Sequence, residues 1–314
     1  MRVLVTGSNG LLGTKLVEQL LARGHEAVGS GRGDRVNGYL GDFRYERLDV
    51  ANAAQVRRVM TSVRPDLVLH AGAVTDVDGC ERPDARERAW ETNAVGSGLV
   101  AEACAEQGAH LVYVSTEYVF DGRAGPYDEE SETNPLGWYA QTKREGEIRV
   151  VAASQGFAIA RTTVVYGHTR HARKDFVAWL LGSLRAGTPV RIVADQIGSP
   201  TLADNLAGMV LAIGLVGASG VFNTAGAEIV SRHEFALKAA RRFGLDESLI
   251  GRVTTAELGL AAPRPLHAGL LMHKFRQRFP DEPVLSIAQA LDVLAGQMGA
   301  TAASSGDTAP GIAS

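Results

Sequence analysis

The sequence predicts an α/β protein: a doubly wound parallel sheet with helices on both faces, joined to a smaller C-terminal lobe. The first observation is a repeating pattern: short β-branched runs, typical of strands, alternate with amphipathic stretches, typical of helices, from residue 2 onward. The second is that these runs are apolar throughout, as expected of parallel strands covered on both faces. The third is size: a chain of 314 residues, 45% of them hydrophobic, can bury one large core or two that share an interface.

Each element of the first half follows from this pattern. Two parallel strands joined through a helix form the βαβ unit from which a doubly wound sheet is built. We expect strands over 2–6, 25–30, 44–50, 66–73, 110–116 and 157–167, with helices over 11–24, 51–63 and 91–107 and a further helix that carries YAQTK at 139–143.

After residue 167 the alternation of strands and helices becomes less regular, with fewer strands and more loops. This is typical of a smaller lobe that closes over a ligand. The last residues lack periodicity, which predicts a disordered tail. The expected division is a sheet domain over 1–166 with part of 197–226, a substrate-binding lobe over 167–196 and 227–298, and the tail over 299–314.

Composition and charge exclude several classes of partner. The net charge is −3 and the pI is near 6.3, so no nucleic-acid-binding surface is expected, and no Lys/Arg run marks a membrane surface. Cys80 and Cys104 belong to no CxxC or Cys/His cluster, so we expect buried thiols in a reducing cytoplasm and no metal site. No export signal or membrane-spanning run is expected. A small molecule remains as the expected ligand.

A glycine-rich turn joins the first strand to the first helix. In TGSNGLLG, three glycines, Gly7, Gly10 and Gly13, stand between RVLVT and LVEQLLARG. The first permits a tight turn, the second lets a pyrophosphate approach the backbone, and the third lets the helix pack on the strand. A glycine-rich loop without a ligand is the alternative, but the order of strand, turn and helix favours a dinucleotide in a Rossmann domain. The other predicted contacts of this turn are Asn9, Leu11 and Leu12.

The end of the second strand bears on the choice between NAD and NADP, since an acid there binds a ribose hydroxyl and a cation meets the 2′-phosphate of NADP. Ser30 occupies the position of the expected acid and Arg32 follows, which favours NADP and leaves NAD as the alternative. In that alternative Arg32 is a solvated loop residue and Asp34 binds the ribose. Asp49 and Val50 end the third strand and are predicted cofactor contacts, although Asp49 is also placed to cap the next helix.

Three polar side chains are expected to meet at the carboxyl edge of the sheet. Thr116 ends a strand, and Tyr139 and Lys143 lie at i and i+4 on one helix face. Reduction of a ketone by a nicotinamide needs a proton on oxygen. Tyr139 would donate it as general acid, the Lys143 cation would lower the pKa of the phenol, and Thr116 would hydrogen-bond the carbonyl oxygen. The alternatives are a chance Tyr/Lys pair on a solvated helix and a Thr116 hydroxyl that caps the next turn.

A resemblance to a known superfamily is carried by TGSNGLLG, HAGA at 70–73, STEYVFDG and YAQTK, which together resemble the extended short-chain dehydrogenase/reductases over nearly the whole chain. Within it, AVTDVDGCE, RTTVVYG, VADQIGSPT and RPLHAGL resemble the dTDP-4-dehydrorhamnose reductase branch. The resemblance implies reduction of the 4-keto group of a nucleotide-linked 6-deoxy sugar by NADPH. It gives Thr116, Tyr139 and Lys143 the catalytic roles and counts the last two as cofactor contacts. The further residues that it places are Ala71, Gly72, Ala73 and Asn93 beside the cofactor and Thr75 and Val77 beside the sugar.

Departures from that branch bear on the substrate. Val164 stands where rhamnose-branch enzymes often carry a Trp beside the sugar. Val164 is therefore a predicted substrate contact, and because the Trp is missing, the identity of the sugar is left open. Glu117 replaces the usual Asp of STDYVF, and Tyr118 stands where nucleotide-sugar dehydratases carry a glutamate base, which argues against dehydration. Arg264 is the predicted cation for a nucleotide diphosphate, with further cations at 170–174, although ordinary surface charges are the alternative.

Three functions are open at this point. The first is the reductase. The second is a non-catalytic NADP-binding subunit, because the regulatory subunit of methionine adenosyltransferase resembles the same branch. The third is a nucleotide-sugar epimerase, which would hold its cofactor tightly. Because this superfamily often pairs through helices that flank the catalytic strand, a homodimer is expected.

Overall fold

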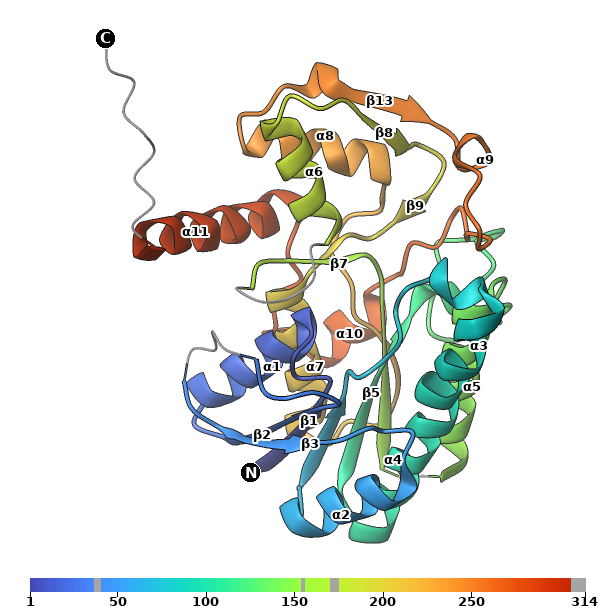
Figure 1. Cartoon of the computed structure of the whole chain (residues 1–314), viewed down its shortest axis with the longest axis vertical. Coiled ribbons are helices and arrows are strands. Elements are labelled where there is room, and N and C mark those ends of the chain that lie inside the picture. The colour runs from blue at the N-terminus through green and yellow to red at the C-terminus, as the bar shows by residue number, and fades with distance from the viewer. Residues whose placement is uncertain (37–40, 154–155, 170–174, 306–314) are drawn as a thin grey trace.

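The computed structural model describes residues 1–36, 41–153, 156–169 and 175–305, with side chains described up to residue 299. A seven-stranded sheet forms the centre of the larger part of the molecule, and all its neighbouring strands are parallel (Figure 1). The order is β11, β6, β5, β4, β1, β2, β3, with bounds β1 Arg2–Thr6, β2 Glu26–Gly31, β3 Arg44–Arg47, β4 Leu67–His70, β5 His110–Thr116, β6 Phe157–Thr162 and β11 Gly220–Asn223. The predicted doubly wound parallel sheet is confirmed.

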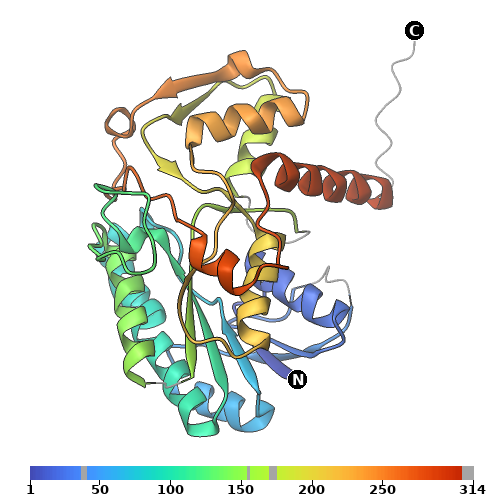
Figure 2. The ribbon, with the colours of Figure 1, turned by 180° about the vertical axis from the view of Figure 1, so that it is seen from behind.

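Helices cover both faces of this sheet (Figures 1 and 2). One face carries α1 Leu11–Ala22, α7 Ala203–Leu215 and α10 His273–Arg278, and the other carries α2 Ala53–Val63, α4 Gly96–Gln107 and α5 Trp138–Ala153, with α3 Pro83–Trp90 beside α5. Alternate residues of β1 serve the two cores, because Val3 and Val5 pack with α1 and α7 while Leu4 packs with α2 and α4. Burial on both faces is the reason that the strands are apolar throughout.

A smaller lobe stands above the carboxyl edge of the sheet (Figure 1). Its core is separate from the two cores of the sheet and contains Tyr166, Phe235 and Leu291. Short strand pairs, β8 with β13, β9 with β12 and β7 with β10, replace a large sheet here. The bounds are α6 Phe176–Arg185, α8 Arg232–Arg242, α9 Thr255–Leu258, α11 Ile287–Ser305, β7 Val165–Tyr166, β8 Val190–Val193, β9 Ile197–Gly198, β10 Thr201–Leu202, β12 Val230–Ser231 and β13 Ile250–Val253.

The strand expected over 157–167 is interrupted in the structure. β6 ends at Thr162, and the chain resumes as β7, which pairs with β10 of the smaller lobe instead of the large sheet. Val164 lies between the two strands with a φ of 35°. The run RTTVVYG is β-branched on both sides of this turn, so composition alone did not reveal the break.

Helix α11 continues to Ser305, so the segment predicted to be disordered from residue 299 begins inside this helix. Alanine at 300, 302 and 303 has the highest helix propensity and extends the helix without any apolar periodicity. The rest of the predicted tail, 306–314, and the cations at 170–174 lie outside the described residues. Within the described part of the chain, none of the helices combines the length and apolar character that crossing a bilayer requires.

A buried ion pair ties α5 to the sheet. Arg161 on β6 donates from Nε to Oε1 of Glu147 at 2.9 Å and from Nη2 to Oε2 at 2.8 Å. The two side chains are 5% and 1% exposed, and the guanidinium also lies 5.2 Å from the centre of the Phe120 ring. Glu147 is also paired with Arg144 at 3.4 Å, but loss of Glu147 would leave the buried charge of Arg161 without a carboxylate, so this pair fixes how α5 sits on the sheet.

Replacing Glu147 by Gln should lower the free energy of unfolding by about 3–5 kcal/mol, because Arg161 would keep its charge without a buried carboxylate. The matched control is Glu145→Gln on the same helix, which removes a partly exposed pair with Arg149 at 2.8 Å. Exposed pairs of this kind contribute about 0–1 kcal/mol. Urea denaturation measures both effects, and equal losses in the two variants would contradict the role given to Glu147.

Candidate active site

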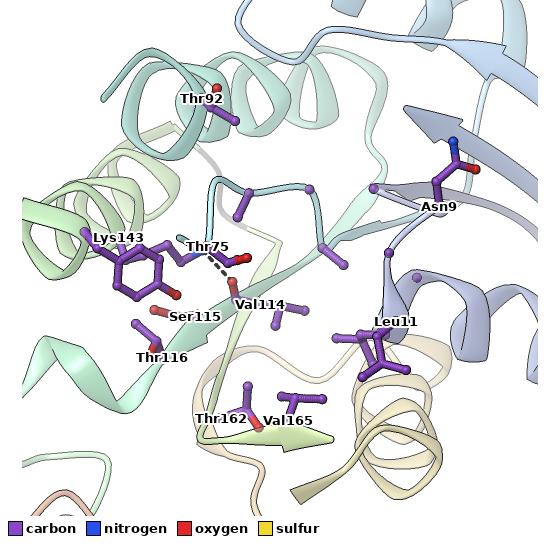
Figure 3. Close-up of a pocket in the computed structure, with 18 of the residues that line it drawn as sticks. Asn9, Leu11, Thr75, Thr92, Val114, Ser115, Thr116, Lys143, Thr162 and Val165 are labelled. Atoms are coloured by element: carbon purple, nitrogen blue, oxygen red, sulfur yellow. Dashed lines mark hydrogen bonds between the residues drawn. The ribbon is translucent and has the colours of Figure 1, made fainter. Parts of the chain in front are cut away.

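A cavity of about 840 Å³ lies at the carboxyl edge of the sheet (Figure 3). The loops after β1, β2, β4, β5 and β6 reach it together because parallel strands all end at the same edge. Its volume lies in the range of small-molecule and cofactor sites. Most predicted site residues line it, namely Gly7, Asn9, Gly10, Leu11, Leu12, Gly13, Arg32, Asp49, Val50, Ala71, Gly72, Ala73, Thr75, Val77, Thr116, Tyr139, Lys143 and Val164. In the described part of the chain, Ser30, Asn93 and Arg264 stand outside this lining.

The glycine-rich turn brings two backbones into close approach. Gly7 has a φ of +67°, and a Cβ atom there would lie 2.6 Å from the Cα atom of Gly72, so only glycine fits. A Cβ atom on Gly13 would overlap the carbonyl oxygen of Gly7. Helix α1 begins directly after Gly10, and its first backbone N–H groups point to the cavity end of the helix, where an anion such as a phosphate is stabilised.

The end of β2 presents a cation to the cavity. Arg32 lines the cavity, whereas the Ser30 side chain is fully buried and donates to the carbonyl oxygen of Val5 at 3.2 Å. The carboxylate of Asp34 is paired with Arg47. The alternative in which Asp34 binds a ribose would therefore require this ion pair to break, and Arg32 is the better placed of the two.

Asp49 lines the same cavity at the start of the loop to α2. Its Oδ1 atom accepts from the backbone N–H of Ala51 at 3.2 Å, but it does not cap the helix. The cap of α2 is Asn52, whose side chain accepts from the backbone N–H of Gln55 at 3.0 Å. Asp49 lines the cavity as the sequence predicts, with its Oδ2 atom 3.8 Å from the Arg88 guanidinium.

Thr116, Tyr139 and Lys143 meet on one wall of the cavity, and Figure 3 shows Thr116 and Lys143 there with Ser115 beside them. Thr116 ends β5, and the other two lie one turn apart at the start of α5. The Lys143 Nζ atom donates to the carbonyl oxygen of Val114 at 2.7 Å and lies 4.1 Å from the centre of the Tyr113 ring. Tyr139 is 8% exposed, and its phenol lies near enough to the Thr116 hydroxyl for that hydroxyl to lower the pKa of the phenol.

Burial controls the ionisation of this cluster. It raises the pKa of Tyr139, the charge of Glu117 raises it further, and the nearby Thr116 hydroxyl lowers it. Burial also lowers the pKa of Lys143 to about 7, against the opposing effect of Glu147. The expected lowering of the phenol pKa by Lys143 is not among these influences, and burial keeps the proton on Tyr139, which is therefore a donor.

The Thr116 hydroxyl has two neighbours in the next turn. It donates to Oε2 of Glu117 at 2.8 Å and accepts from the backbone N–H of Tyr118 at 3.2 Å, so it caps the short helix η3 (Glu117–Val119). The capping alternative is therefore confirmed, and the same residue also lines the cavity. Tyr118 packs edge-on against Tyr139, with ring centres 5.7 Å apart.

Asn93 supports the cavity without lining it. It lies in the π-helical turn η2 (Glu91–Val95) and is fully buried. Its amide donates to the carbonyl oxygen of Val74 at 3.0 Å and to Thr142 at 3.0 Å, and its oxygen accepts from the Val74 N–H at 2.8 Å. Asn93 thus holds the loop that carries Ala71 and Gly72 against the helix that carries Tyr139.

His70 supports the same loop from below. Its ring lies 2.6 Å from the Thr6 hydroxyl through Nδ1 and 3.1 Å from Ser97 through Nε2, and Thr6 accepts from the Gly72 N–H at 3.2 Å. Burial and the charge of Lys143 lower the pKa of His70 to about 3, so the ring is neutral. His70 is therefore a packed core residue rather than a catalytic acid or base.

A second cavity of about 460 Å³ adjoins the first and shares Thr75, Val77, Tyr118 and Arg232 with it. Its outer wall comes from the smaller lobe, with three guanidinium groups and two aromatic rings: Arg191, Arg232, Arg264, Phe176 and Trp179. Arg264 donates to Asp78 at 2.6 Å. The predicted substrate cation is therefore placed here, beside the loop that carries Thr75 and Val77.

Sequence reasoning did not assign several cavity-lining residues to the site. Those that directly follow strands could have been found by the same carboxyl-edge rule that found Thr116. Arg232 could not, because it begins α8 and reaches the cavity only through the packing of the smaller lobe. The residues without a prior assignment are Gly31, Gly33, Leu48, Thr92, Val114, Ser115, Glu117, Tyr118, Thr162, Thr163, Val165, Asp175 and Arg232.

A parallel Rossmann sheet, a glycine-rich turn and a Thr/Tyr/Lys cluster at the carboxyl edge define a protein of the extended short-chain dehydrogenase/reductase kind. More narrowly, the chain belongs to the RmlD substrate binding domain family, whose model matches residues 1–292.

Three similar proteins illustrate the family. The chain is 36% identical over 276 residues to dTDP-4-dehydrorhamnose reductase of Mycobacterium tuberculosis, covering 86% of this chain and 84% of the relative. It superimposes on a crystal structure of dTDP-4-dehydrorhamnose reductase from Bacillus anthracis in complex with NADP, with a TM-score of 0.81 and 29% identity, over 94% of this chain and 99% of the other. It is also 30% identical over 274 residues to methionine adenosyltransferase 2 subunit beta of Xenopus tropicalis, covering 84% of this chain and 78% of the relative.

Replacing His70 by Asn should flatten the dependence of stability on pH. His70 has a pKa of about 3 when folded and about 6.5 when unfolded, so between these values the unfolded chain binds the extra proton. Stability is therefore lost as pH falls below about 6.5, by about 2 kcal/mol at pH of about 5. Denaturant titrations at several pH values, with exposed His273→Asn as control, measure this slope. If stability depended on pH to the same extent in His70→Asn as in wild type, the conclusion that the buried His70 ring is neutral would be contradicted.

Proposed function

We propose that this protein is an NADPH-dependent reductase of the 4-keto group of a nucleotide-linked 6-deoxy sugar, acting like a dTDP-4-dehydrorhamnose reductase. The observation that carries the proposal is that Thr116, Tyr139 and Lys143 share one cavity with the glycine-rich turn. The relatives named dTDP-4-dehydrorhamnose reductase, one of them solved with NADP, support the same reaction.

The cavity residues fit a dinucleotide. The close approach of Gly7 to Gly72 leaves a backbone cradle that any Cβ atom would fill, and the start of α1 offers N–H groups to a pyrophosphate. Arg32 is a cation for the 2′-phosphate of NADP, with NAD as the alternative cofactor. NADPH, when bound, supplies the hydride that reduces the ketone carbon.

The chain's own residues would supply and control the proton. Tyr139 donates its phenolic proton to the ketone oxygen, the product is the alcohol, and solvent returns a proton to the phenolate. Thr116 lies beside the phenol and would hold the ketone oxygen. The Lys143 ammonium stabilises the phenolate, and because burial sets its pKa at about 7, this help declines as pH rises through that value.

The second cavity is the proposed place of the nucleotide half of the substrate. Three guanidinium groups line it: Arg191 and Arg232 would neutralise a diphosphate directly, and Arg264 would do so on exchanging its bond with Asp78. The Trp179 side chain lines the same cavity with 45% of its surface exposed, which offers a ring on which a base can stack. The shared residue Arg232 would then lie between the sugar and the diphosphate.

A non-catalytic NADP-binding role is the second candidate, favoured by the similarity to methionine adenosyltransferase 2 subunit beta. The same cavity would then serve binding alone, and turnover of a keto sugar distinguishes the two. An epimerase, the third candidate, would keep its nucleotide through purification.

Three further assignments belong to the proposal. They are the division into a sheet domain and a substrate lobe at the boundaries predicted from the sequence, a homodimer, and a cytoplasmic location. Cys80 and Cys104 are free and buried, which suits a reducing compartment.

Replacing Tyr139 by Phe should reduce kcat for NADPH oxidation with dTDP-4-keto-6-deoxy-L-lyxo-hexose by at least about 10²-fold, because the general acid is lost. NADPH binding, measured by fluorescence titration, should remain. Tyr127→Phe is the control, since that phenol donates to Asp121 at 2.8 Å away from the cavity lining. If Tyr139→Phe turned over the keto sugar at the wild-type rate, Tyr139 would be excluded as the proton donor.

Replacing Arg32 by Gln should raise the KM for NADPH by about tenfold or more and leave the KM for NADH nearly unchanged, because a bond to a charged phosphate contributes about 1.5–3 kcal/mol. Arg35→Gln is the matched control, since Arg35 is already paired with Asp42 at 2.6 Å. Steady-state kinetics with both cofactors measure the effect. If Arg32→Gln weakened NADPH and NADH equally, Arg32 would not be the 2′-phosphate ligand.

A further inference from the structure

The proposed reaction leaves one buried carboxyl group in the cavity without a role. Glu117 follows Thr116 directly, lines the cavity and is only 5% exposed. Its Oε2 atom lies 2.8 Å from the Thr116 Oγ1 atom. An acid buried beside the proposed proton donor raises the question of what its ionisation does to the neighbouring hydroxyls.

The answer follows from a count of hydrogen bonds at Thr116. A threonine hydroxyl has one proton to donate and two lone pairs that accept. Its neighbours here are the Glu117 carboxyl group, the backbone N–H of Tyr118 at 3.2 Å, which can only donate, and the Tyr139 phenol. One lone pair is therefore always taken by Tyr118, and Glu117 decides how the other lone pair and the proton are used.

An ionised Glu117 can only accept, so it takes the Thr116 proton. Thr116 then has no proton left for a ketone oxygen or for the phenolate that Tyr139 becomes, so it cannot donate to either.

A neutral Glu117 reverses the direction of these bonds. Its O–H donates to Thr116, both lone pairs of Thr116 are then filled, and the Thr116 proton is free for the ketone oxygen or for the phenolate that Tyr139 becomes. Neutral Glu117 also removes the negative charge that raises the pKa of Tyr139. Both effects make Tyr139 a better acid.

We propose that Glu117 is a positioning residue whose protonation state sets the direction in which Thr116 donates, and that reduction proceeds when Glu117 is neutral. The inference rests on the proposed reductase function.

The surroundings of Glu117 set the direction of the pH dependence. Burial is the largest influence and raises its pKa, while the bond from Thr116, the nearby Thr163 hydroxyl and the charge of Arg232 on α8 lower it. Tyr118 from its own turn and Tyr139 from α5 are the other titratable groups that it faces. Glu117 is neutral below its pKa, so activity should fall as pH rises through that value, in addition to the decline that Lys143 causes.

The test is Glu117→Gln, because a glutamine amide, unlike a carboxylate, can donate to Thr116 at every pH. Its kcat for the keto sugar should stay within about threefold of wild type at the acid end of the profile. Above the pKa of Glu117 the variant should gain about tenfold over wild type for each pH unit, because wild type loses its neutral fraction at that rate. Glu130→Gln, an exposed change of the same charge, should follow the wild-type profile.

Two results would overturn the inference. One is a Glu117→Gln profile that superimposes on that of wild type. The other is a loss above about tenfold at the acid end in a variant with normal circular dichroism and NADPH binding, which would show that the carboxyl group itself is needed.

Infrared titration of wild-type protein, with ¹³C-labelled glutamate side chains, makes the test independent of that variant and of turnover. A neutral carboxyl band should disappear over the pH range in which kcat falls, and Thr116→Val should shift it. If no glutamate titrates there, the inference fails. If no keto sugar is reduced by wild type, the proposed function fails instead, and the Thr116→Val shift still decides whether the two groups are coupled.

Discussion

The common direction of the strands is the constraint on which the rest of the structure depends. Because all seven strands of the large sheet are parallel, the loops after β1, β4 and β5 leave from one edge. Gly7 and Gly72 follow β1 and β4, Thr116 ends β5, and all three line a single cavity. The smaller lobe stands over that edge and closes it, so Arg232 reaches the cavity that the sheet begins (Figure 1). The site is therefore a consequence of topology first and of individual side chains second.

Local sequence signals predicted the parts of the structure that depend on short-range constraints. Gly7 and Gly13 are required by backbone contacts within one turn and its neighbour, and Tyr139 and Lys143 share a helix face by periodicity alone. The break at Val164 was missed, because β-branched residues continue across it and only the pairing of β7 with β10 explains it. The Thr116 to Glu117 bond was missed for a different reason: a one-residue spacing gives no indication of which side chains turn inward.

Buried polar groups connect the core of the protein to the cavity. Arg161 holds Glu147, Glu147 supports the charge of Lys143, and Lys143 lies one helical turn from Tyr139. In a medium of low dielectric constant such bonds are strong when complete and costly when broken, so each fixes the geometry of the next. Asn93 likewise fixes the geometry of the loop after β4 through its hydrogen bonds to the Val74 backbone. The rigidity of the site thus originates behind the cavity wall.

Val164 shows where the two parts of the fold make incompatible demands on the chain. Thr162 is still paired with Thr116 in the large sheet, whereas Val165 already pairs with Thr201 in β10. Only a sharp turn joins these registers, and Val164 takes a φ of 35°, a conformation that costs a β-branched residue about 1–3 kcal/mol. The strain is maintained because its carbonyl oxygen accepts from the Thr201 N–H at 3.1 Å and because both flanking strands are paired. The turn places Val164 in the cavity lining, between the wall that carries Thr116 and the smaller lobe. A short side chain there leaves room that a large aromatic one would fill, so this residue bears on both the crossing between the lobes and the shape of the cavity.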